Sequence, residues 1–251
     1  MTYTHLTSLM VVEFGILSAA LSVAFHRSAL PHMSSVVLKM GLAISIVGLI
    51  NMLANMDDPT QIWPVVYIAL TSSLYAIIFS VVAYLIDSNI PDNSGSEETP
   101  ASSTAQRVIS LLIWLFTLLA IISLNPSNIK LFFSIPATTM TLLGVIVLAT
   151  IGQWSPTSSG VSSVANKLPI FGLIILWISN GGMLIYNQPK SLGPIMAIGF
   201  LTLFYAHIIS TCIQLFFPSH IKPQKLLTQS IIIGGSLIGL FLAIYILTIS
   251  F

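Results

Sequence analysis

Long apolar runs separated by short polar turns recur along the whole chain. A helix needs roughly 20 apolar residues to cross the ~30 Å hydrocarbon core of a bilayer. Eight runs approach or exceed this length, near residues 4–25, 35–54, 64–86, 107–124, 131–151, 168–186, 194–217 and 226–250. Because lipid offers the backbone no hydrogen-bond partners, each run must satisfy its own backbone groups as an α-helix. We therefore predict an all-α, polytopic integral membrane protein with about eight transmembrane helices.

Composition excludes several classes of protein. Hydrophobic residues make up 55% of the chain and charged residues only 6%, whereas about a quarter of the residues of a soluble domain are charged. A single cysteine, Cys212, excludes an internal disulfide and a cysteine-based metal cluster. The sequence has no basic run that would bind nucleic acid, no nucleotide-binding glycine loop, no metal-ligand spacing and no nucleophile constellation. We expect neither an enzyme nor a cofactor.

The distribution of Lys and Arg predicts the orientation of the helices. Loops on the cytoplasmic side of membrane proteins carry an excess of these residues. With the N-terminus outside, six fall on the inside, Arg27, Lys39, Arg107, Lys167, Lys222 and Lys225, and two fall on the outside, Lys130 and Lys190. We therefore predict that both termini lie outside and that the polar linker 87–106 lies inside.

One apolar run carries an unusual group of hydroxyl side chains. Thr71, Ser72, Ser73 and Tyr75 stand within the run 64–86. Their oxygens can replace part of the water around a small cation that crosses between helices. Alternatively, each hydroxyl bonds back to the carbonyl four residues earlier and serves only for packing. The residues alone leave both interpretations open.

The sequence around this group resembles a known family. The block N-M-L-A-N-M-D-D-P at 51–59, followed by A-L-T-S-S-L-Y-A at 69–76, is similar to the third and fourth transmembrane helices of flagellar stator ion-channel subunits. This is the MotA/PomA family, distantly related to TolQ and ExbB, and the resemblance covers about forty residues. Ser45 stands at the position of a Thr in the family's third helix, and Ser72 and Ser73 stand at its Thr pair in the fourth.

The resemblance implies an ion-channel subunit in a bacterial inner membrane that passes protons or sodium. In such a membrane, the outside termini predicted from the Lys and Arg distribution lie in the periplasm. Family members form a ring of five chains around two single-span MotB/PomB-like partner helices, each of which brings an Asp that takes the ion. The chain contains no such Asp-bearing span, so conduction requires a second protein. The family's large cytoplasmic torque domain has no counterpart, because the corresponding connections, 26–34 and 152–167, are too short.

The chain also shows signs of duplication. Laying 41–84 on 172–214 pairs Gly41 with Gly172, Pro59 with Pro189, Pro64 with Pro194 and Tyr75 with Tyr205. We predict two tandem four-helix repeats, 1–125 and 126–251. The positions that match Ser45, Ser72 and Ser73 are Leu176, Thr202 and Leu203, so the second repeat has lost most of the hydroxyls. Because each chain then supplies two repeats, we expect a homo-oligomer of three chains rather than a ring of five.

Five further residues are candidates for the ion pathway. Glu13 lies nine residues into the first run and His207 lies within the seventh, and ionisable groups at such depth indicate function. A neutral hydrogen-bonded acid and a satisfied interhelical histidine are the alternatives. Asp57 and Asp58 either attract cations at a pore mouth or only form the turn before Pro59. Pro169 matches a family proline that is linked to gating.

Three functions are compatible with these features. The first is an ion-channel subunit whose pathway contains Ser45, Thr71, Ser72, Ser73, Tyr75, Thr202 and Tyr205. The second is a non-conducting scaffold that holds other membrane subunits together. A solute carrier with duplicated architecture is the third. It is the weakest, because four-helix repeats share one orientation and the sequence has no pair of broken helices.

Overall fold

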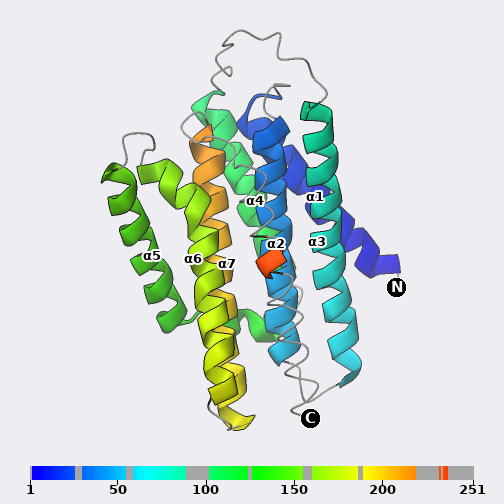
Figure 1. Cartoon of the computed structure of the whole chain (residues 1–251). Helices are drawn as coiled ribbons and strands as arrows, with labels where there is room; N and C mark the ends of the chain where they lie inside the picture. Colours follow the sequence, from blue (N-terminus) through cyan, green and yellow to red (C-terminus); the bar gives the residue numbers. More distant parts are fainter. Residues whose placement is uncertain are drawn as a thin grey trace.

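The computed structural model of the chain is a bundle of helices (Figure 1). It describes residues 2–25, 30–54, 59–88, 102–123, 126–154, 160–185, 189–218, 232 and 234–236. The elements are α1 (Thr2–Ser22), α2 (Leu30–Ala54), α3 (Pro59–Ser88), α4 (Thr104–Ser123), the 3₁₀ helix η2 (Pro126–Phe132), α5 (Ile135–Trp154), α6 (Gly160–Ile185) and α7 (Pro189–Phe216). No strand occurs in these ranges.

The predicted class, an all-α multi-pass membrane protein, agrees with this architecture. Six stretches, one in each of α2 to α7, are long and apolar enough to cross a membrane. The apolar part of α1, Val12–Ser22, is shorter. Most of the eighth expected span, 226–250, lies outside the described residues, as does most of the linker 87–106. The count of eight helices and the tandem repeat therefore stay predictions.

Two helix starts differ from the prediction. We expected a helix from 35 and another after Pro64, but α2 begins at Leu30 and α3 begins at Pro59. Proline fits the first helical position, because the N–H that it lacks has no partner there in any helix. Lys39, which we counted with the inside loops although it falls in the predicted run 35–54, lies well inside α2. Without Lys39, the expected orientation is supported by five basic residues against two.

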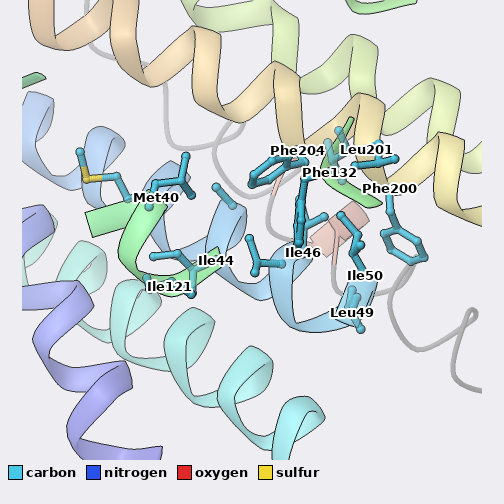
Figure 2. Close-up of a cluster of buried hydrophobic side chains, with 14 of the residues drawn as sticks. Met40, Ile44, Ile46, Leu49, Ile50, Ile121, Phe132, Phe200, Leu201 and Phe204 are labelled. Atoms are coloured by element: carbon cyan, nitrogen blue, oxygen red, sulfur yellow. The ribbon is translucent and has the colours of Figure 1, made fainter. Parts of the chain in front are cut away.

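The helix α2 lies at the centre of the bundle. Every residue of α2 from Ser34 to Met52 is buried, as expected of a helix that is apolar on all sides. Figure 2 shows Ile46 and Ile50 of α2 near Phe200 and Phe204 of α7. By contrast, α4 and α5 expose many large apolar side chains, among them Leu112, Phe116, Leu119, Leu143 and Ile146. Exposed apolar faces of this kind are suited to lipid or to a neighbouring membrane protein.

Two glycines allow helices to approach closely. A Cβ on Gly41 of α2 would collide with the Ala76 side chain of α3, and a Cβ on Gly172 of α6 would lie 2.9 Å from the Ala206 side chain of α7. Small residues of this kind let membrane helices pack backbone to backbone. Under the predicted alignment Gly41 matches Gly172, and Ala76 matches Ala206. A duplicated helix pair is expected to show this correspondence.

Candidate functional site

Two of the predicted pathway hydroxyls lie together between α2 and α3. Ser45 Oγ donates to the carbonyls of Gly41, at 2.9 Å, and Ala69, at 2.6 Å. Ser73 Oγ lies 3.2 Å from the Ala69 carbonyl and 3.0 Å from that of Leu70. Both side chains are buried. Since each hydroxyl gives its hydrogen to a carbonyl, its oxygen lone pairs are left as acceptors.

These two serines line a small, partly open cavity where α2, α3, α6 and α7 meet. Its lining residues are Leu42, Ser45, Ile46, Leu49, Ala69, Ser73, Leu176, Phe200, Leu203 and Ser236. The space inside for water is about 20 Å³, which is room for one water molecule. Leu176 and Leu203 are the predicted counterparts of Ser45 and Ser73, so matching positions of the two expected repeats face the same cavity. We call this space the serine cavity.

The other predicted hydroxyls do not line the serine cavity. Thr71 Oγ1 donates to the Tyr67 carbonyl and Thr202 Oγ1 donates to that of Ile198, each at 2.8 Å. These are bonds to the carbonyl four residues earlier, which fit the packing interpretation. Ser72 Oγ is buried and has no hydrogen-bond partner among the described residues.

The two paired tyrosines have different surroundings. Tyr205 OH donates to the Phe132 carbonyl at 2.5 Å and accepts from the Ser134 N–H at 3.2 Å. It thereby ties α7 to the junction between η2 and α5. Tyr75 is half-buried and packs against the main apolar core. Both tyrosines contribute to helix packing, and neither is among the residues that line the serine cavity.

The predicted ionisable candidates lie apart from one another. Glu13 is exposed on the outer surface of α1, whereas His207 of α7 is 0% exposed. Neither ring nitrogen of His207 has a hydrogen-bond partner within the described part of the chain. Pro169 lies inside α6 and is buried. Asp57 and Asp58 lie outside the described residues.

Sequence reasoning missed a buried lysine. We counted Lys39 among the inside basic residues, but its side chain is 1% exposed between α2, α6 and α7. Its Nζ donates to the Ala165 carbonyl at 2.8 Å and to Ser210 Oγ at 2.9 Å, and both partners are neutral. Only two acids, Glu13 and Asp87, lie in the described ranges. A lysine inside the apolar run 35–54 was the available signal.

Pro169 explains why a backbone carbonyl is available to this lysine. A proline inside a helix has no N–H to give to the carbonyl four residues earlier, which here belongs to Ala165. That carbonyl instead accepts hydrogen bonds from Lys39 Nζ and from Ser210 Oγ. The predicted gating proline thus leaves the Ala165 carbonyl free to accept a hydrogen bond from the buried Lys39 amino group.

Ser210, a hydrogen-bond partner of Lys39, belongs to a polar row on α7. His207, Ser210 and Gln214 follow one another at spacings of three and four and therefore share a helix face. Gln214 Nε2 lies 3.3 Å from Asn166 Oδ1 and 3.5 Å from Ser35 Oγ. In the other direction, the same face continues to Leu203 and Phe200, which line the serine cavity.

Comparisons with protein-family models, with curated proteins and with solved structures find no match to this chain. The resemblance to stator channels therefore depends on the residues quoted for it, and what it implies about function is a proposal. The described residues also contain no group of three or more His, Cys, Asp or Glu side chains that could hold a metal ion.

Proposed function

We propose that the chain is an ion-channel subunit of a bacterial inner membrane. It works with a single-span, Asp-bearing partner and uses a proton or sodium gradient, as the stator resemblance implies. The observation that supports this function best is the serine cavity. Ser45 and Ser73 come from neighbouring helices, line the same small cavity, and donate their hydrogens to carbonyls. Their lone pairs are what a cation or a water molecule inside a membrane requires.

A non-conducting scaffold is the second candidate, and a specific observation favours it. Seven of the ten residues that line the serine cavity are apolar, and the space holds about one water molecule. Hydroxyls bonded to backbone carbonyls also occur as simple packing devices in membrane helices. Under this function the fold holds other membrane subunits together, and the cavity is a minor packing defect.

Replacement of Ser73 distinguishes between the channel function and the scaffold function. In inverted vesicles from native membranes, where any partner is present, Ser73→Leu fills the serine cavity and removes an oxygen. We expect it to abolish the proton and sodium uptake that depends on this chain, and Ser73→Ala to reduce that uptake without added bulk. Uptake is measured with a pH-sensitive dye and with radioactive sodium, against vesicles that lack the chain.

The matched control is Ser80→Ala. Ser80 lies on the same helix and is also buried, but its Oγ donates to the Ser34 carbonyl at 2.7 Å and does not line the cavity. We expect this variant to retain uptake. Unchanged uptake, assembly and cellular phenotype in Ser73→Leu would contradict the channel and support the scaffold.

A further inference from the structure

We propose that Lys39 and His207 form a buried proton-carrying pair that delivers protons along the interface of α2 and α7 to the serine cavity. This inference deepens the proposed channel function and depends on it, because it names the transported ion as the proton. It also places the proton-binding groups inside this chain.

The position of Lys39 is the first argument. Lys39 lies nine residues from the start of α2, or about 14 Å along the helix at 1.5 Å per residue, which is near the middle of a ~30 Å hydrocarbon layer. A buried ammonium group is costly unless it is paired, and its observed partners are a carbonyl and a hydroxyl. An ionisable group at this depth indicates function by default.

The acceptor of Lys39 is built into the fold. Because Pro169 leaves the Ala165 carbonyl without its usual helical donor, α6 offers a backbone oxygen at the depth of the lysine. Ser210 of α7 supplies the second oxygen. An ammonium group has three hydrogens to donate. Two of them account for these bonds, and the third is left for a proton acceptor.

We assign the acceptor role to His207. It precedes Ser210, a hydrogen-bond partner of Lys39, by three residues on the same face of α7. It is fully buried, and neither ring nitrogen has a partner among the described residues. The two hydrogen-bond partners of Lys39 Nζ, Ser210 Oγ and the Ala165 carbonyl, are neutral.

The transfer is a chain of proton exchanges. The Lys39 ammonium gives one proton to a ring nitrogen of His207, which leaves a neutral amine and an imidazolium. The imidazolium then releases its other ring proton to a water molecule in the serine cavity and becomes neutral. The amine takes up a new proton from a hydronium ion of the aqueous phase, which enters at the bundle end where Gln214, Ser35 and Asn166 meet and becomes water.

Three substitutions test the pair in the same vesicle assay. We expect Lys39→Met and His207→Gln to lower chain-dependent proton uptake by about a hundredfold, the scale of a lost proton-transfer group. Lys39→Arg keeps the positive charge and the hydrogen-bond donors, but a guanidinium does not release its proton in proteins. We expect it to lose uptake as well. If Lys39 had only a structural role, the Lys39→Arg variant would retain chain-dependent proton uptake.

Lys167→Met is the matched control, because Lys167 is exposed on α6 and should leave uptake unchanged. If the Lys39→Arg variant retains chain-dependent proton uptake, the proposed Lys39–His207 pair is contradicted. If Lys39→Arg does not accumulate in the membrane, the His207→Gln result decides. Sodium uptake that survives Lys39→Met and His207→Gln but is lost in Ser73→Leu overturns only this inference. If the vesicles show no chain-dependent uptake of either proton or sodium, the channel function is contradicted as well.

Discussion

At the scale of residues, the Ala165 carbonyl shows how a helix defect becomes a binding partner. Pro169 removes one helical hydrogen bond, and a lysine and a serine from two other helices use the freed oxygen. Polar groups in a membrane interior are stable only when other protein groups satisfy them. The proline on α6 and the lysine on α2 are therefore parts of one arrangement, although 126 positions separate Lys39 from Ala165.

Replacement of this proline should have opposite effects on stability and uptake. Pro169→Ala restores an N–H that competes with Lys39 for the Ala165 carbonyl. Proline in a helix interior is about 3 kcal/mol less favourable than alanine, and one displaced hydrogen bond offsets about 1 kcal/mol. We expect the free energy of unfolding in detergent to rise by about 1–2 kcal/mol and chain-dependent proton uptake to fall.

Pro136→Ala is the comparison for that variant. Pro136 stands in the first turn of α5, where the missing N–H has no helical partner anyway. Its replacement should leave both stability and uptake nearly unchanged. A loss of stability in Pro169→Ala would show that the lysine contact outweighs the helical bond.

At the scale of elements, small residues determine which helices pack together. The α2 and α3 pair meets at Gly41 and Ala76, and the α6 and α7 pair meets at Gly172 and Ala206. In lipid, apolar surface alone does not drive helices together, so close packing and interhelical hydrogen bonds have to do so. The Ser45 bond to the Ala69 carbonyl, from α2 to α3, is one such bond.

The close approach at Gly41 is a testable weak point. A Cβ in Gly41→Ala would collide with the Ala76 side chain, and overpacking of this kind costs about 1–3 kcal/mol. Gly181→Ala is the control, because a Cβ at Gly181 meets nothing within 4 Å. We expect it to stabilise α6 by up to about 1 kcal/mol. Thermal unfolding in detergent measures both, and Ala76→Gly should partly rescue Gly41→Ala.

At the scale of the whole molecule, α2 packs among the other helices of the bundle (Figure 1) and is buried from Ser34 to Met52. By contrast, α4 and α5 expose large apolar side chains. Glu13 is exposed on α1, where a neighbouring chain or partner can reach it. The exposed faces are available for lipid or for further copies of the chain. This arrangement is compatible with the three-chain assembly that we propose.

That assembly predicts a particular mass. In nanodiscs or mild detergent we expect a protein mass three times 27.1 kDa, plus that of any partner, because three chains with two repeats each would close a ring of six. Native mass spectrometry or particle imaging measures it. A particle with five equivalent units would contradict the three-chain assembly.

The sequence by itself predicted the six apolar, membrane-length helices α2 to α7, although not where α2 and α3 begin, because hydropathy and helix length are local properties that the bilayer thickness constrains. Only the tertiary structure decided that Ser45 and Ser73 share a cavity with Leu176 and Leu203, and that Lys39 lies against Ala165 and Ser210. These contacts join helices far apart in the chain, and the apolar pattern that identifies a membrane helix does not specify which face meets which neighbour.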